Sequence, residues 1–172
     1  MITVPLDYED GIRKIPNALT KNAGEPYNKV LLDCIELGEK ELLSKVLGEA
    51  QYLVLESELL KLPFKTGESE TAGQIWQDLV NGKGSFTGLK NICMNYVYCK
   101  YLKETEIRLS TTGSGKPKVK NHSVTDYNQK YVERWNEFVC WVGDMGTFLN
   151  DTDGLERRYD YPCYELENQF GL

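Results

Sequence analysis

One stretch of the sequence contains residue types that bind phosphate in other proteins. Gly113-Ser114-Gly115-Lys116 matches the end of a phosphate-binding loop, where backbone N–H groups and a lysine hold phosphate oxygens. The complete loop also needs a glycine at position 110, a Ser or Thr after the lysine, and a preceding strand. Ser110 and Pro117 occupy the first two of these positions, and a helix is predicted upstream. We therefore predict no nucleotide site.

Two further features concern metal ions. The run from Asp151 to Gly154 is similar to the middle of a calcium-binding loop, but in that register Leu149 stands at the first ligand position. A helix stop followed by a turn explains the run better. His122 is the single histidine, so a zinc site lacks its usual partners and a solvated side chain is the default. A Cys–His nucleophile pair is an alternative without a signature, and we predict no catalytic residue, no metal site and no cofactor.

The cysteines predict thiols in place of disulfides. None belongs to a C-x-x-C pair, and an odd number leaves at least one of them unpaired. Most lie inside apolar helical patterns, which is typical of reduced, buried thiols in a protein made in a cytosol. The five are Cys34, Cys93, Cys99, Cys140 and Cys163.

The rest of the chain is organised around the stretch Leu89–Leu109. Between Ile92 and Leu102 only Asn95 and Lys100 are strongly polar, and no Gly or Pro interrupts the run. A helix that is apolar on nearly every side is usually buried by its neighbours. A strand is the rival interpretation because Tyr and Val favour strands, but the run is too long for a typical strand. We therefore predict a central buried helix.

A second long helix is predicted over Val124–Leu149. Its apolar residues recur at spacings of three and four, which is the pattern of a seam that packs on another helix. The seam is Tyr131, Trp135, Phe138, Val142, Met145 and Leu149. The segment 110–123 joins the two long helices and is too long and polar for a tight turn, so we predict a projecting loop or a short β-ribbon. The predicted core comprises Ile92, Cys93, Tyr96, Val97, Trp135, Phe138 and Val142.

Shorter helices precede this pair. Asn28–Leu47 has one apolar face and is predicted to end at Gly48, after which Glu49–Leu60 resumes a helical pattern. Thr71–Val80 is predicted to form a short helix. The predicted fold class is therefore all-α, a helical bundle around a central buried helix that occupies residues 28–150.

Both ends of the chain are predicted to be extended arms. Residues 1–27 contain three prolines and no steady helical period, so this N-terminal arm must lie on its own domain or on a neighbour. Residues 151–172 also lack a period and are rich in aromatic side chains, which predicts a C-terminal arm. No signal peptide opens the chain, and we expect a protein that is not exported by a signal of its own.

Composition and charge narrow the class of protein. A chain of 172 residues that is 41% hydrophobic and 27% charged is typical of one soluble domain with a real core, and no stretch approaches the length of a membrane span. The net charge of −6 argues against general nucleic-acid binding. The charge is unevenly distributed, because 110–123 holds three lysines and no acid whereas the tail from Asn150 holds six acids. A basic loop and an acidic tail could join copies of the protein, and two solvated segments are the alternative.

The order of these features resembles the head–tail connector proteins of tailed bacteriophages, also called adaptor or head-completion proteins. An amphipathic helix reaches Leu-Gly-Glu at 47–49, and a short helix carries Ile-Trp-Gln-Asp-Leu at 75–79. A long helix rich in Tyr follows, then a Thr-Gly-Ser-Gly loop with alternating Lys and Val over 112–120, and then the last long helix. The pattern is similar to the versions in Bacteroidota and crAss-like phages. It covers residues 28–149 and rests on order more than on an invariant signature.

The resemblance implies a structural virion protein that forms a ring, commonly of about twelve copies, in the neck between portal and tail. It implies residence in the host cytoplasm before assembly, contacts with the portal protein and adjacent neck or tail proteins, and at most non-specific contact with packaged DNA. The candidate interface residues are Lys116, Lys118, Val119, Lys120, Arg157, Arg158, Tyr159, Tyr161, Tyr164, Phe170 and Leu172. A small helical regulator or adaptor of a host or phage protein is the alternative, and a small enzyme is a further one.

Overall fold

The computed structural model describes residues 1–15, 18–19, 28–61, 64, 72–111, 124–157 and 160–168, and for 106–111 and 124–128 it describes the backbone alone. Within these ranges the chain forms helices and no strand, so the predicted all-α class is confirmed. The elements are η1 (Pro5–Tyr8), η2 (Gly11–Arg13), α1 (Lys29–Glu58), α2 (Gln74–Asn81), α3 (Leu89–Thr111) and α4 (Val124–Asp151).

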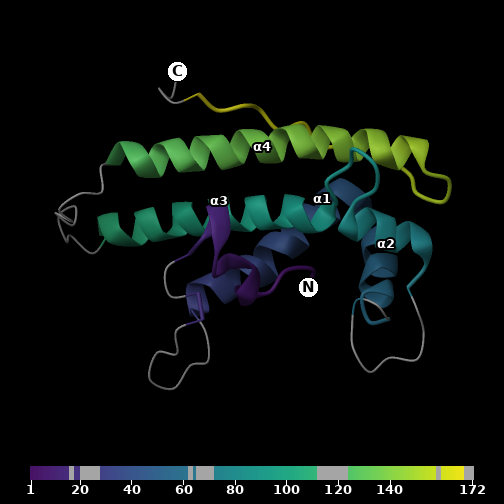
Figure 1. Cartoon of the computed structure of the whole chain (residues 1–172), viewed down its shortest axis with the longest axis horizontal. Coiled ribbons are helices and arrows are strands. Elements are labelled where there is room, and N and C mark those ends of the chain that lie inside the picture. The colour runs from purple at the N-terminus through teal and green to yellow at the C-terminus, as the bar shows by residue number, and fades with distance from the viewer. Residues whose placement is uncertain are drawn as a thin grey trace.

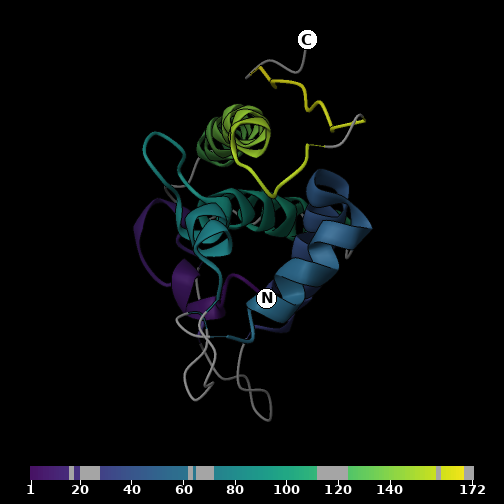
Figure 2. The same cartoon turned by 90° about the vertical axis from the view of Figure 1, so that its right-hand side faces the viewer.

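Helix α3 is the centre of the bundle. It packs against α4 on one side and against α1 on the other, with α2 beside its first turns (Figures 1 and 2). Leu89, Ile92, Cys93 and Val97 on α3 are fully buried. This arrangement confirms the central buried helix, because an element that is apolar on nearly every side has to be covered by neighbours on more than one side.

The predicted seam of α4 faces α3. All of its members except Trp135 are buried, so the three-and-four spacing identified the packed face correctly. The predicted core needs one correction, because Tyr96 and Trp135 are only partly buried. Trp135 lies at the edge of the α3–α4 contact, where its indole N–H reaches a backbone carbonyl outside the bundle.

Helix α1 changes direction at Gly48, where the sequence predicted that the first helix would end. Gly48 has φ 76° and ψ 160°, a backbone conformation that residues with a Cβ rarely adopt. Both halves of α1 remain helical around it. Asn28 caps the first half, because its side-chain oxygen accepts a hydrogen bond from the Leu31 N–H at 3.3 Å.

The described part of the N-terminal arm lies on its own domain. Two 3-10 helices, η1 and η2, fold this segment against α1 and α3 (Figure 1). Tyr8, Ile15 and Ala18 are buried with apolar residues such as Ile35 and Val97 in a second core cluster. The sequence allowed the arm to lie either on its own domain or on a neighbouring protein. In the structure, residues 1–15 lie on the chain's own domain.

The cysteines follow the prediction in part. All five are thiols, and Cys34, Cys93 and Cys99 are buried as expected. Cys140 and Cys163 are exposed, which corrects the prediction of buried thiols. Cys140 lies on the outer face of α4, and Cys163 lies in the irregular segment after that helix, where no apolar layer covers it. Among the described residues, no helix is long and apolar enough to cross a membrane.

Candidate functional site

The chain after α4 turns back and runs along that helix (Figure 1). We call residues 155–168 the C-terminal segment, of which 158 and 159 lie outside the described residues. Most of the residues that hold it lie on α1 and α4, and we call these the receiving face: Gln51, Tyr131, Trp135, Asn136, Phe138 and the surface of Gly146. The segment has neither helix nor strand, so these contacts determine its path.

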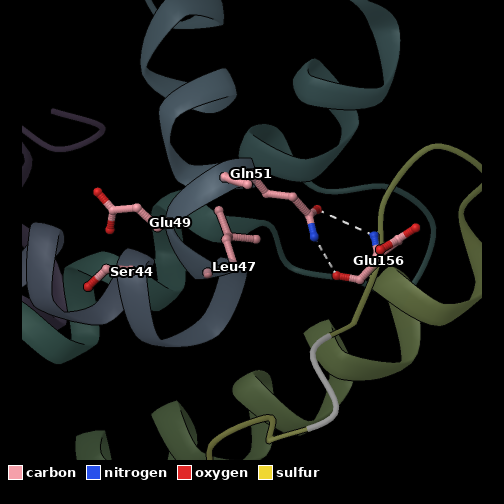
Figure 3. A pocket seen from close by; sticks show the side chains of 7 residues that line it. Ser44, Leu47, Glu49, Gln51 and Glu156 are labelled. Atoms are coloured by element: carbon pink, nitrogen blue, oxygen red, sulfur yellow. Dashed lines mark hydrogen bonds between the residues drawn. The ribbon is translucent and has the colours of Figure 1, made fainter.

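The first contact joins the segment to the kinked part of α1. The side-chain Nε2 of Gln51 donates to the backbone carbonyl of Glu156 at 2.6 Å, and the Glu156 N–H donates to Gln51 Oε1 at 3.3 Å. Figure 3 shows both bonds beside a pocket of 490 Å³ whose walls include Ser44, Leu47 and Glu49. One amide side chain thus satisfies both backbone groups of one residue, as a neighbouring strand would.

A second amide pair holds the far end of the segment. Asn136 Nδ2 donates to the Glu167 carbonyl at 2.7 Å, and the Glu167 N–H donates to Asn136 Oδ1 at 2.8 Å. The indole N–H of Trp135 donates to the Glu165 carbonyl at 2.9 Å. These bonds reach backbone atoms, so the receiving face contacts the backbone at both ends of the segment.

Two tyrosines from the predicted interface set anchor the segment between these ends. The Tyr161 hydroxyl donates to the Val142 carbonyl at 2.9 Å, and its ring lies against Gly146, where an added Cβ would be 3.2 Å from a ring carbon. Tyr164 meets the rings of Phe138 and Trp135 edge-on, with centroids 4.9 and 5.9 Å apart. The lack of a Cβ at Gly146 therefore lets the Tyr161 ring lie close to α4.

Charged groups complete the contact. The guanidinium carbon of Arg157 lies 4.7 Å from the centre of the Tyr161 ring, so these two predicted interface residues are brought together. At the other end, Lys103 Nζ lies 4.7 Å from the centre of the Tyr131 ring and 3.8 Å from the Glu167 carboxylate. Tyr131 also donates to that carboxylate at 3.1 Å. These exposed charges add modest energy and help to set the position of the segment.

The other predicted interface residues lie outside the described residues. They are Lys116, Lys118, Val119, Lys120, Arg158, Tyr159, Phe170 and Leu172. The segment 110–123, predicted as a loop or β-ribbon, lies outside them as well except for the end of α3. The described geometry therefore bears on Arg157, Tyr161 and Tyr164 alone.

A polar network that the sequence did not predict links the N-terminal arm to α3 and α4. Asn95, fully buried on α3, accepts a hydrogen bond from Arg13 Nε and donates to Glu137 at 2.8 Å. Arg134 donates to the same Glu137 oxygen at 2.8 Å. Burial lowers the pKa of Arg13, whose guanidinium also lies over the Trp141 ring. The network satisfies the buried Asn95 amide and ties three segments together.

The second polar residue of the central stretch has a similar role. Lys100 Nζ lies 2.7 Å from the Glu41 carboxylate on α1, which also bonds Lys45 at 2.8 Å. Hydrogen bonds from Lys100 and Lys45 lower the pKa of Glu41 to about 2. This cluster connects α1 to α3 and leaves Glu41 charged at neutral pH.

Two buried thiols are weakly reactive, and the metal-ligand side chains among the described residues are dispersed. Among them, no three His, Cys, Asp or Glu side chains lie close enough to hold a metal ion. Burial raises the pKa of the Cys99 thiol to about 12 and that of Cys93 above its ordinary value, which makes both thiols poor nucleophiles. The receiving face holds the chain's own C-terminal segment in this structure.

No protein-family model, no curated protein and no solved structure matches the chain. Functional reasoning therefore rests on the residues and their geometry. Sequence reasoning selected Tyr161 and Tyr164 as aromatic residues of the C-terminal arm, which the resemblance assigns to contacts between subunits. It missed Gln51 and Asn136, whose polar side chains are typical of any exposed helix and carry no signal for a bond to backbone far along the chain.

Proposed function

We propose that the chain is a structural protein that assembles as a ring in the neck of a tailed bacteriophage, between portal and tail. The order of helices supports this proposal: the kinked α1, the short α2, and α3 beside α4 follow the pattern on which the resemblance rests. In this assembly, neighbouring copies and the portal protein are the partners, and the segment 110–123 and the tail after α4 supply contacts.

One observation carries the proposal further than helix order. The C-terminal segment is held on the outside of the bundle by side chains that bond its backbone. Among its described residues Leu155 alone is buried, and Tyr161 and Tyr164 are partly buried against the core. A surface whose side chains bond the backbone of a peptide segment in this way is suited to protein–protein contact. The polar clusters around Asn95 and Glu41 join segments of the chain to one another, which suits a structural role.

Mass spectrometry and electron microscopy of purified particles test the proposal. We expect the chain among the virion proteins of the phage that encodes it, and a ring of density between capsid and tail that a tagged copy labels. As the control, a phage early protein of similar abundance should be lost during particle purification. Absence of the chain from particles, together with a defined heterodimer in a pull-down from infected cells, would instead support the regulator alternative.

The solution state gives a second test. We expect the isolated protein to be a monomer or a weak oligomer, because a ring held by arms usually forms on its template. Light scattering over a range of concentrations measures this. A tight, discrete dimer without any partner would favour the regulator.

A further inference from the structure

We propose that the part of α1 after its bend at Gly48 is a docking surface for an amphipathic helix of another protein, one whose apolar stripe is bordered by lysine or arginine. The inference goes beyond the proposed function and does not depend on the ring, because it concerns a surface of the isolated chain. The surface has two features, an exposed apolar stripe and an acidic pocket beside it.

The apolar stripe lies on the outer face of this second half of α1. Each residue of an α-helix advances about 100° around the axis, so residues three and four apart share a face. Ala50, Leu53, Val54 and Ser57 share the outer face in this way, and Leu60 follows in the next turn. We call these five residues the outer stripe. Leu53, Val54 and Leu60 are 54%, 46% and 54% exposed.

The opposite face of the same half-helix is already packed. Tyr52 and Leu55 are buried there, and Leu59 lies against the core. Figure 2 shows α1, in blue, at the edge of the molecule, with the other helices on one side of it. A helix that is apolar on two opposite faces is usually covered on both, and the described residues cover one. The outer stripe is therefore the kind of surface that a partner completes.

The spacing within the outer stripe favours a helix as that partner. Ala50 and Ser57 are small, and Leu53 and Leu60 alternate with them at steps of three and four residues. With this repeat, the large side chains of one helix fill the spaces between those of another. An extended strand presents its side chains at a period of two and matches the stripe less well.

An acidic edge borders the outer stripe. Glu49 and Glu56 lie seven residues apart, beside Leu53 and Leu60 on one side of the helix. Both glutamates are exposed, and among the described residues neither forms an ion pair with a lysine or arginine. A helix that docks on the outer stripe therefore brings its own edge against two carboxylates that lack a cationic partner in the described structure.

The acidic edge leads to a pocket at the bend of α1. Residues from both halves of the helix line this pocket, which has a volume of 200 Å³. Small-molecule sites are typically larger, about 300–1,000 Å³, so the pocket suits a side chain better than a cofactor. Leu43 and Leu59 give it apolar walls, and Glu36 and Glu56 bring carboxylates to the same lining. A lysine or arginine side chain, with its apolar stem and charged end, matches this combination.

The ionisation of Tyr52 is sensitive to the charges around this pocket. Its hydroxyl donates a hydrogen bond to Glu56 at 2.5 Å. Burial, this bond and the charges of Glu56, Glu39 and Glu49 raise the pKa of Tyr52 to about 12. Lys40 also lines the pocket, but the charges that contribute to the shift of Tyr52 are all carboxylates. The potential at the Tyr52 hydroxyl therefore favours a positive group.

The same charges distinguish a basic helix from a second copy of the chain. A second copy that docked through its own outer stripe would bring another acidic edge, and like charges that meet at an interface oppose association. A helix with lysine or arginine along its edge gains attraction from Glu49 and Glu56 instead. The favoured occupant is therefore a helix of another protein.

Fluorescence anisotropy with three labelled helical peptides, each about 18 residues long, tests the docking surface on the full chain. The first peptide has a leucine stripe with lysines along one edge, and the second has glutamates in place of these lysines. The third has the composition of the first in an order that forms no stripe. We expect the first to bind at least about tenfold more tightly than either of the others. Equal affinity for the first peptide and either of the others would overturn the proposal.

Two pairs of variants locate the site. Leu53→Ser should weaken binding of the lysine-edged peptide about tenfold or more, whereas Leu166→Ser, at a residue 64% exposed on the C-terminal segment, should leave it unchanged. Glu56→Lys should also weaken binding about tenfold, whereas Asp144→Lys makes the same change of net charge at an exposed residue of α4 and should have little effect. Circular dichroism checks that each variant is folded. Equal effects within either pair would overturn the proposal.

Measurements on the unchanged chain complete the test without depending on a variant's fold. In methyl NMR spectra, the lysine-edged peptide should shift the resonances of Leu53, Val54 and Leu60 and leave those of Leu166 in place. Shifts confined to other methyl groups would overturn the proposal. A concentration-dependent dimer in light scattering that Leu53→Ser abolishes would assign the outer stripe to a second copy and would also overturn it.

Discussion

Thr3 and Glu39 lie 36 residues apart in the sequence and hold one another in the interior. The Glu39 carboxylate accepts hydrogen bonds from the Thr3 N–H at 2.7 Å, from the Thr3 hydroxyl, and from the Ile2 N–H at 2.7 Å. Thr3 is 0% exposed and Glu39 is 2% exposed. The Tyr8 hydroxyl donates to Thr3 Oγ1 at 3.2 Å and extends the network. A buried carboxylate thus holds the N-terminal arm against α1.

This relationship predicts that Glu39→Ala releases the N-terminal arm. The change leaves three donors without their acceptor, and they regain hydrogen bonds only by moving into water. We expect a loss of about 1–3 kcal/mol in the free energy of unfolding and faster proteolysis within residues 1–15. Chemical denaturation and limited proteolysis measure the two effects. Glu36→Ala is the matched control, because Glu36 is exposed on the same helix, and equal effects of the two changes would contradict the prediction.

The same residue predicts a dependence of stability on pH. Burial raises the pKa of Glu39 above its ordinary value of 4.5, although hydrogen bonds from Thr3 and Ile2 act in the opposite direction. Between the ordinary and the raised pKa the folded state holds more protons than the unfolded state, so stability falls as pH rises through this window. Relative to Glu39→Gln, which does not titrate, the free energy of unfolding should fall by at most about 1.4 kcal/mol per pH unit. The free energy of unfolding of the unchanged protein minus that of Glu39→Gln would contradict this prediction if it stayed constant or grew with pH. Such a result would show that the hydrogen bonds from Thr3 and Ile2 offset the cost of burying the ionised carboxylate.

Phe138 and Trp135, neighbours on the seam of α4, should respond differently to truncation. Phe138 is fully buried, and Phe138→Ala should lower the free energy of unfolding by about 3–5 kcal/mol. Trp135 is partly buried and bonds the C-terminal segment, so Trp135→Ala should lower it by a smaller amount, about 1–3 kcal/mol. Urea denaturation measures both changes. A loss below about 1 kcal/mol for Trp135→Ala would mean that its ring contacts contribute little.

The two glycines near the end of α4 provide a matched pair. Gly143→Ala adds a methyl group into open space and favours the helix, so it should raise stability by up to about 1 kcal/mol. Gly146→Ala gains the same propensity but places Cβ 3.2 Å from the Tyr161 ring, which must move outward. We expect Gly146→Ala to be less stable than Gly143→Ala and to expose Tyr161, as measured by thermal unfolding and amide exchange of the C-terminal segment. Equal stabilisation by both changes would show that the segment adjusts freely.

Sequence reasoning succeeded where contacts follow the period of one helix. The seam of α4, the buried face of α3 and the break at Gly48 are local patterns, and the structure contains all three. Sequence reasoning failed where a side chain bonds the backbone of a residue far away in the chain. Gln51 and Glu156 are 105 residues apart, and neither residue type indicates a partner. Trp135 belongs to both cases. Its spacing correctly placed it on the seam of α4, but the sequence did not predict that its indole N–H bonds the Glu165 carbonyl in the C-terminal segment.

The basic segment 110–123 leads to the last prediction, which concerns assembly. Lys116, Lys118 and Lys120 alternate with other residues, so in an extended strand they would project on one face toward an acidic partner. Exposed ion pairs contribute about 0–1 kcal/mol each, and one lysine change should therefore do little. Changing all three to Glu places like charges against that partner, and repetition around a ring multiplies the penalty.

We expect this triple Lys→Glu variant to keep its helical circular dichroism and its melting temperature, because the described core is built from the helices and the N-terminal arm. It should nevertheless be missing from purified particles, as judged by mass spectrometry. A triple Lys→Gln variant, which removes charge without reversing it, should show an intermediate level because attraction is lost but repulsion is absent. Normal incorporation of a normally folded Lys→Glu variant would exclude the segment as an assembly element, and the two ends of the chain would then be the parts that hold the ring together.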